Sequence, residues 1–263
     1  MNRTGFLIAL AVAVAVGLPF GLFPKLDLDL SALFFEPDRF GNWLAAGTPL
    51  QLRTMMTWLI ALIAAPAFLA LAVKLVLPRR QLILPGRAIV LMIATLALAP
   101  GLLANVILKD HWGRPRPIEV VEFGGDDHFV PWWDPRGTCP KNCSFVAGEP
   151  SGAFWTLAPA ALAPPHWRVV AYGAALAFGA AVGLLRMAGG AHFFTDVVFA
   201  GVFTFLIVWL VHGLLYRWRT MRISDEAVER MLEWVAMPAY RAVARLVARL
   251  RTPAGQSKDQ SRL

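Results

Sequence analysis

Long apolar blocks constrain this chain more than any other feature of its sequence. Six of them are each about long enough to cross a bilayer as a helix. They cover residues 6–23, 54–77, 88–108, 145–163, 169–187 and 193–216. Backbone groups cannot stay unpaired in hydrocarbon, so blocks of this kind must form helices. We therefore expect an all-α, polytopic membrane domain with six transmembrane helices over residues 1–216.

The composition agrees with a membrane protein and bears on its partners. Hydrophobic residues make up 57% of the chain and charged residues 16%, while the formal net charge is +8. In a membrane protein, excess Lys and Arg report topology and contact with anionic lipid before they report nucleic acid. The sequence has no zinc-finger spacing and no RNA-binding signature, so we expect no nucleic-acid partner.

The C-terminal segment, residues 217–263, differs from the apolar blocks. Apolar residues between Ile223 and Val235 keep helical spacing, and Ser224 or Asp225 is available to start the helix. Further on, basic residues recur every fourth position: Arg241, Arg245 and Arg249. This pattern predicts an amphipathic basic helix on the cytoplasmic leaflet. The polar end from Thr252 onward is expected to be disordered.

The distribution of basic residues indicates the orientation of the chain. Positive residues favour the cytoplasmic side. They occur before the first block, in the second and fourth connections and in the tail, which places both termini in the cytoplasm. The loops 24–52, 109–144 and 188–192 then face outward. Lys109, Arg114 and Arg116 lie in an outer loop against this preference, so another function must retain them there.

Two cysteines, Cys139 and Cys143, lie in the same outer loop. A closely spaced pair on the outer side of a membrane can form a small disulfide loop. A zinc site would need four ligands. His128, Asp126 and Asp127 are nearby, but their spacing matches no zinc motif. We favour the disulfide and expect no metal.

Three ionisable residues, Arg186, His192 and Asp196, lie between apolar stretches near the end of the membrane domain. Such groups cost roughly 2.5–3.5 kcal/mol each at the centre of a membrane helix, and they usually mark functional sites. His192 and Asp196 are one helical turn apart, so the carboxylate can orient the imidazole. The alternative is a set of helix-end anchors near the membrane surface. We favour the functional interpretation.

Cations gather on the outer side together with this histidine. Lys109, Arg116 and Arg186 are three cations suited to phosphate oxygens, and two of them are planar guanidinium groups. Gly148 lies where the fourth helix should begin, and free N–H groups at a helix start favour an anion. The combination indicates phosphoryl transfer, with His192 as the nucleophile.

These residues resemble the type 2 phosphatidic acid phosphatase superfamily. Its first signature, Lys-x6-Arg-Pro, is matched by Lys109, Arg116 and Pro117. Its third signature is matched by Arg186, His192 and Asp196, with Leu185 in place of a serine. The resemblance covers roughly residues 50–216. It implies a nucleophilic His192 oriented by Asp196, a phosphohistidine intermediate, and no metal or other cofactor.

The second signature, Pro-Ser-Gly-His, departs from the family and fits in two registers. Pro150, Ser151 and Gly152 match literally but put Ala153 in the histidine position. A longer frame from Ser144 through Gly148 to Phe154 puts Glu149 there instead. We favour the longer frame. In the family this histidine protonates the leaving oxygen.

The departure leaves three alternatives for residue 149 and the missing proton donor. Glu149 is the general acid, or it binds an amine on the substrate headgroup, or His111 supplies the proton. Burial raises the pKa of a carboxylic acid and so keeps it protonated and able to donate, whereas nearby cations lower that pKa.

The predicted function is that of a lipid phosphate phosphatase in the bacterial inner membrane, with its active site on the periplasmic side. Candidate substrates are lipid A phosphate, phosphatidic acid, phosphatidylglycerol phosphate and undecaprenyl pyrophosphate. The altered second signature favours a specialised glycolipid such as lipid A. A lipid-to-lipid phosphotransferase and a non-catalytic lipid-phosphate binding or transport protein are the alternatives. The sequence does not predict an oligomeric state.

Overall fold

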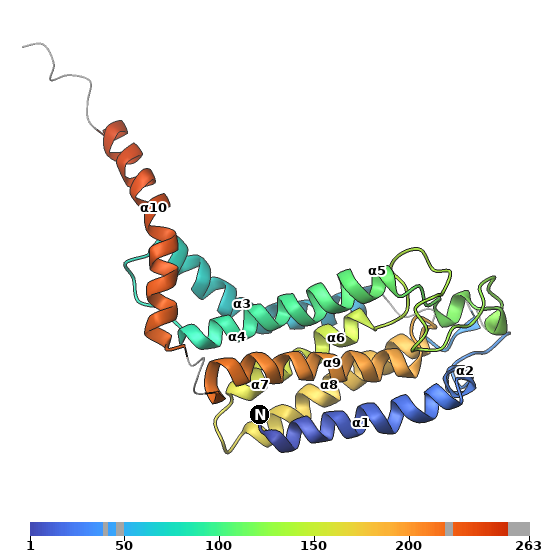
Figure 1. The fold of residues 1–263 in the computed structure, drawn as a ribbon. Helices are drawn as coiled ribbons and strands as arrows, with labels where there is room; N and C mark the ends of the chain where they lie inside the picture. Colours follow the sequence, from blue (N-terminus) through green and yellow to red (C-terminus); the bar gives the residue numbers. More distant parts are fainter. Residues whose placement is uncertain (39–41, 46–49, 219–222, 252–263) are drawn as a thin grey trace, which may run out of the picture.

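A computed structural model describes residues 1–38, 42–45, 50–218 and 223–251. Within these residues every regular element is helical, and the long helices run side by side in one bundle (Figure 1). Five of the described helices are long and apolar enough to cross a membrane: Arg3–Leu22, Gln51–Val76, Gly86–His111, Arg168–Ala188 and Phe194–Arg217. Five of the six predicted blocks therefore form such helices. The chain end from Thr252 lies outside the described residues.

Helix α9 runs through the middle of the bundle and contacts most of the others. It covers Phe194–His212 and is extended by the π-helical turn η5, Gly213–Arg217. Helix α1, Arg3–Leu22, packs along it, and α8, Arg168–Ala188, lies beside it. Other helices therefore surround α9. His192, the predicted nucleophile, lies just before its first residue.

The third long helix is built from three consecutive elements. It consists of α4 (Gly86–Leu96), the π-helix η2 (Ala97–Leu108) and α5 (Lys109–His111), and it packs against α3 (Leu50–Val76). Pro100 has no N–H to donate, which disturbs the regular helical bonding. The side-chain amide of Asn105 donates to the Pro100 carbonyl at 2.6 Å. This wide-turned segment carries Lys109 to the end of the bundle near His192.

The fourth predicted block, 145–163, is not one continuous helix. It forms α6 (Gly148–Phe154) and α7 (Leu157–Leu162), which pack between α8 and α9. Pro159 cannot donate to the Trp155 carbonyl, and Ala158 N–H donates there instead at 2.8 Å, which tightens the turn. The close approach depends on small residues, because a Cβ on Gly179 would lie 2.2 Å from the Phe154 ring. A sixth span stays a prediction.

Loops at the outer end form an aromatic lid beside the predicted site. Helix α2, Lys25–Ala32, and the loop after it meet the turns η3 (Pro117–Glu119) and η4 (Val121–Phe123). Buried Trp43, Val120, Phe123 and Phe193 form the centre of this cluster. Gly190 adopts φ +67°, and a Cβ there would lie 2.5 Å from Trp43. The cluster therefore anchors the loop that carries His192.

Helix α10, Asp225–Arg251, crosses the opposite end of the bundle (Figure 1). Its start agrees with the prediction, since the Ser224 hydroxyl oxygen accepts the Ala227 N–H at 3.1 Å. Its first half docks on α3 and α4. Lys74 Nζ lies 2.8 Å from Glu229, and Arg87 lies 2.7 Å from Asp225. The tail is thus fastened to the membrane domain by two ion pairs.

Candidate active site

His192 lies in the short loop between α8 and α9, and its side chain is almost completely buried. Its Nδ1 lies 2.8 Å from the backbone carbonyl oxygen of Ser144. A carbonyl oxygen only accepts hydrogen bonds, so Nδ1 must carry the proton in this contact. The tautomer assigned on this geometry leaves Nε2 with its lone pair. This is the protonation state that a nucleophilic histidine needs.

Asp196 lies behind the imidazole, but it does not act through the helical turn that the sequence predicted. Helix α9 begins at Phe194, so His192 precedes the helix rather than lying on its face. The Asp196 Oδ2 atom is 3.8 Å from His192 Nδ1, within ion-pair distance. The same oxygen accepts the Phe193 N–H at 2.8 Å and the Ser144 hydroxyl at 2.5 Å. Asp196 therefore caps α9 and holds both neighbours of the imidazole.

Arg114 completes a fully buried ion network around Asp196. Its guanidinium donates to Asp196 Oδ1 at 2.5 Å and to Asp27 Oδ2 at 2.8 Å. It also donates to the Thr195 hydroxyl and to the Val130 carbonyl, each at 2.9 Å. Asp27 in turn accepts the Thr195 N–H and hydroxyl. Two buried carboxylates thus share one guanidinium, which ties α2, the outer loop and the start of α9 together.

The surroundings of His192 favour its neutral form. Burial lowers the pKa of His192 below its ordinary value, and the positive charges of Lys109 and Arg186 act in the same direction. The carboxylate of Asp196 opposes this shift. At neutral pH the imidazole is therefore unprotonated at Nε2, as attack on phosphorus requires.

The structure brings the three predicted phosphate-binding cations to one place. Arg116 and Arg186 both lie within electrostatic reach of Lys109, and Lys109 and Arg186 both act on His192. Gly148 adjoins them: a Cβ there would lie 2.5 Å from Asn105 Oδ1 and 3.5 Å from Lys109 Cδ. A glycine at the start of α6 thus lets the chain pass close to the Lys109 side chain. The cluster can hold the equatorial oxygens of a phosphoryl group.

Glu149 lies between two guanidinium groups at the edge of this cluster. It is 2.5 Å from Arg53 and 3.4 Å from Arg186, and about a third of its side chain is exposed. Two adjacent cations stabilise the ionised carboxylate, so without substrate Glu149 is a poor proton donor. The structure therefore places Glu149 among the cations, as the longer frame requires, and supplies it with a partner on α3.

The two competing residues lie elsewhere. Ser151 is buried, and its hydroxyl pairs with the Thr204 hydroxyl of α9 at 2.8 Å, inside the helix packing. His111 is exposed, and its Nδ1 lies 3.0 Å and 3.1 Å from the Ile107 and Val106 carbonyls of its own helix. Glu149 thus contacts two cations, whereas Ser151, from the other register, bonds within the helix packing and His111, from the first signature, bonds to its own helix.

The outer loop contains a disulfide between Cys139 and Cys143. The loop it closes is pinned to the site at several points. Cys143 N–H donates to the Lys109 carbonyl at 2.8 Å, and Arg116 donates to the Asn142 carbonyl at 2.7 Å. The disulfide loop therefore fixes the backbone on which the Arg116 side chain rests.

The sequence assigned no role in the site to four residues that support it: Asp27, Arg53, Arg114 and Ser144. Arg114 was singled out only as a cation retained in the loop 109–144 against the positive-inside preference, and Arg53, next to the loop 24–52, offered the same signal. Ser144 is the first residue of the longer second-signature frame. Asp27 had no signal, because acidic residues are common in the loop that contains it.

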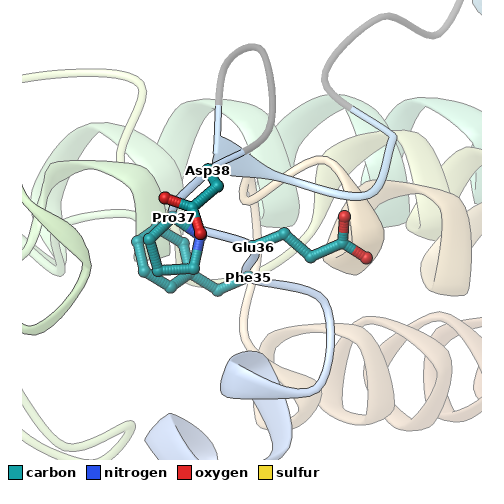
Figure 2. Close-up of a pocket in the computed structure, with 4 residues that line it drawn as sticks. All are labelled: Phe35, Glu36, Pro37 and Asp38. Atoms are coloured by element: carbon teal, nitrogen blue, oxygen red, sulfur yellow. The ribbon is translucent and has the colours of Figure 1, made fainter.

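A pocket lies in the loop after α2, apart from these groups. Figure 2 shows its described lining, Phe35, Glu36, Pro37 and Asp38, with the Glu36 side chain extending away from the other three. This lining includes none of the predicted site residues. Phe35 also packs on Trp43 in the aromatic lid, so the pocket adjoins that cluster.

A comparison with protein-family models decides what kind of site this is. The model of the PAP2 superfamily matches residues 88–222, which is more than half of the 263 residues. The chain belongs to the PAP2 superfamily. The match spans both signatures and confirms the resemblance seen in the sequence. No solved structure matches this PAP2 chain.

Curated relatives of this PAP2 protein share one description. A lipid A 4'-phosphatase of Francisella tularensis subsp. novicida is 34% identical over 230 residues, which cover 82% of this chain and 98% of that protein. A lipid A 4'-phosphatase of Rhizobium leguminosarum is 41% identical over 106 residues, 40% of this chain and 46% of that protein. Family and relatives confirm the predicted class. The protein is a membrane phosphatase that acts on lipid phosphates.

Proposed function

We propose that this protein removes a phosphate from a lipid A-type glycolipid through a phosphohistidine intermediate. The observation that carries the mechanism is the Ser144 carbonyl at His192 Nδ1, which leaves the Nε2 lone pair free on a ring within electrostatic reach of Lys109 and Arg186. The identity to lipid A 4'-phosphatases over most of both chains supports the substrate class. Phosphatidic acid, phosphatidylglycerol phosphate and undecaprenyl pyrophosphate become the comparison substrates.

In the first step, His192 Nε2 forms a bond to phosphorus while the bond from phosphorus to the lipid oxygen breaks. Lys109, Arg116 and Arg186 hold the equatorial oxygens, whose negative charge they stabilise throughout the transfer. Attack leaves a positive imidazole, with its proton still on Nδ1. Asp196, 3.8 Å from that atom, stabilises this charge.

The leaving oxygen needs a proton, and Glu149 is our candidate to supply it. In the substrate-free protein its carboxylate pairs with Arg53 and Arg186. A bound phosphate competes for Arg186 and places negative charge beside Glu149. Both changes favour the protonated form of the carboxyl group. Arg53 then keeps the group in position through the contact that remains.

In the second step, water attacks phosphorus, the Nε2–phosphorus bond breaks, and inorganic phosphate leaves. Glu149, now ionised, accepts a proton from the attacking water, as microscopic reversibility requires. His192 returns to its neutral Nδ1–H form. Every role in this cycle falls on a side chain of the protein, and we propose a metal-independent reaction.

We also propose that the site faces the periplasm and that both termini are cytoplasmic. Arg79 and Arg80 lie in the connection between α3 and α4, and Arg87 lies in the first turn of α4. This connection is at the end of the bundle opposite the loop between α8 and α9, which carries His192 (Figure 1). A concentration of Arg at this end supports a cytoplasmic placement. The end that carries His192 then faces the periplasm. In this orientation a lipid A-type substrate enters the site from the periplasmic leaflet of the bacterial inner membrane.

The test is release of inorganic phosphate from a lipid panel by the detergent-purified protein, with and without EDTA. We expect lipid A to be the best substrate, EDTA to have no effect, and His192→Ala to fall to background. Phosphate release that survives in His192→Ala contradicts the phosphohistidine. Loss of substrate phosphate without free inorganic phosphate would instead identify transfer to a second lipid, and binding without turnover would identify a lipid-phosphate binding protein.

A further inference from the structure

The C-terminal part of α10 presents an amphipathic surface that leaves the bundle. The C-terminal part of the helix projects past α3 and α4 (Figure 1). Within the part of the chain that the structure describes, the side chains of Val243, Leu246 and Val247 are 60%, 58% and 40% exposed. Three exposed branched apolar side chains within five residues form a small apolar surface of the kind that marks an interaction site.

The first part of the same helix identifies the side on which that partner lies. Val228 and Ala236 are buried against the bundle, and a Cβ on Gly86 would lie 2.7 Å from Val228. The ion pairs of Lys74 with Glu229 and of Arg87 with Asp225 fix the rotation of the helix about its axis. The side that carries Val228 and Ala236 therefore faces the ends of the membrane-spanning helices.

The exposed apolar residues lie on that same side of α10. Leu246 follows Val228 by about five helical turns, and Val247 follows Ala236 by about three, at 3.6 residues per turn. Helix α10 runs across the end of the bundle (Figure 1), so in a bilayer the side facing the spanning helices is also the side facing the lipid. Past the bundle, this side meets lipid instead of protein.

The charges around this segment define the lipid. Arg241 and Arg245 are exposed and lie on the side of the helix away from Leu246. Arg79 and Arg80 are exposed in the adjacent connection, and the Arg79 guanidinium lies 6.0 Å from the Tyr240 ring. Glu229 and Glu233, the acidic residues of the preceding turns, face Lys74 at 2.8 Å and 4.0 Å. The free charge at this end is therefore positive.

We propose that residues 241–248 of α10 form an interfacial anchor for the anionic membrane leaflet on the side opposite the active site. Val243, Leu246 and Val247 enter the boundary between headgroups and acyl chains, while Arg241 and Arg245 contact anionic headgroups. The anchor is separate from the phosphatase chemistry, which takes place at the other end of the bundle.

Nitroxide labels on the full-length protein in nanodiscs test this surface. Cys139 and Cys143 are joined in a disulfide, so an introduced cysteine provides a single reactive thiol. We compare Leu246→Cys with Ala244→Cys, which lies two residues away on nearly the opposite side of the helix. The accessibility of each label to oxygen and to a water-soluble nickel complex is measured in phosphatidylglycerol-containing and in all-phosphatidylcholine bilayers. Phosphate release by each variant confirms its fold.

We expect the Leu246→Cys label to be protected from nickel and accessible to oxygen in the anionic bilayer, and the Ala244→Cys label to show the reverse. Each Arg near an anionic surface strengthens association about fivefold. Arg241→Gln with Arg245→Gln should therefore expose the Leu246→Cys label to nickel in the anionic bilayer. Equal nickel access at both positions overturns the proposal. Spin–spin broadening at Leu246→Cys that disappears on dilution with unlabelled protein also overturns it, because a second copy would then cover the surface.

Discussion

Arg114 donates to Asp196 across 2.5 Å, and both side chains are completely buried. The pair lies next to His192, the proposed nucleophile, because Asp196 also accepts from Ser144, whose carbonyl accepts from His192 Nδ1. The orientation of His192 thus depends on a guanidinium that never meets the substrate. Arg114 is a positioning residue, and it acts through Asp196.

Replacing Arg114 should be among the most destabilising single changes in the chain. Arg114→Met leaves Asp27 and Asp196 buried without their shared cation, which costs about 3–5 kcal/mol of unfolding free energy. Thermal unfolding in detergent measures the loss. Arg136→Met is the matched control, since its ion pair with Asp134 is largely exposed and contributes little. Equal melting temperatures for the Arg114→Met variant and the parent would contradict the network.

The pH dependence of turnover should report the neutral imidazole. Burial lowers the pKa of His192, so the nucleophile stays neutral below pH 6.5 and is lost only when acidification reaches its folded pKa. The free energy of unfolding depends on pH in the same direction. The unfolded chain protonates His192 at a higher pH than the folded chain does, so acidification below about pH 6.5 destabilises the fold.

A profile of kcat/KM against pH checks this prediction. The phosphate monoester also titrates near pH 6, so a variant on the same substrate is needed to isolate the histidine. Asp196 raises the pKa of His192, and Asp196→Asn should therefore move the acid limb to lower pH as it reduces the rate. An acid limb that stays in place in Asp196→Asn would assign it to the substrate.

Residue types and periodicity predicted most of the membrane-spanning helices, because a long apolar block in a bilayer must pair its own backbone groups by forming a helix. They did not reveal the break within 145–163, because hydropathy cannot show that α6 and α7 are buried by protein. Small residues and Pro159 create the break, and their effect depends on neighbours far along the chain, such as Gly179.

Lys109, Arg116, Arg186 and His192 could be grouped from the sequence, because phosphoryl transfer needs fixed residue types at fixed spacings, and the structure brings their side chains near one another. The residues that support His192 could not be predicted in this way. Asp27 reaches Arg114 from helix α2, and Ser144 contributes through its backbone carbonyl, which any residue possesses. Contacts of this kind arise from tertiary placement, and a single sequence carries no pattern for them.

The register of the second signature can be decided by comparing Ser151 with Glu149. Ser151→Ala removes a buried hydrogen bond to Thr204 and should cost about 1–2 kcal/mol of stability with turnover retained. Glu149→Ala should lower kcat/KM for the lipid substrate while the protein stays folded. Melting temperature and phosphate release are measured on both variants. Abolished turnover in Ser151→Ala beside full turnover in Glu149→Ala would establish the other register.

The role of Glu149 can be tested by the quality of the leaving group. If Glu149 protonates the lipid oxygen, Glu149→Gln should slow lipid dephosphorylation by about 10²–10⁴-fold. The same variant should hardly affect p-nitrophenyl phosphate, because p-nitrophenolate leaves without a proton. His111→Gln should leave both rates unchanged, since its ring contacts its own helix.

Arg53→Gln is the control that separates proton donation from the positioning of cations. It removes the 2.5 Å partner of Glu149 but keeps the carboxyl group. If Glu149 only holds Arg53 and Arg186 in place, Glu149→Gln and Arg53→Gln should lower the rates for the lipid and the aryl phosphate together. A selective loss on the lipid phosphate in Glu149→Gln alone would assign the proton to this carboxyl group, where the family has a histidine.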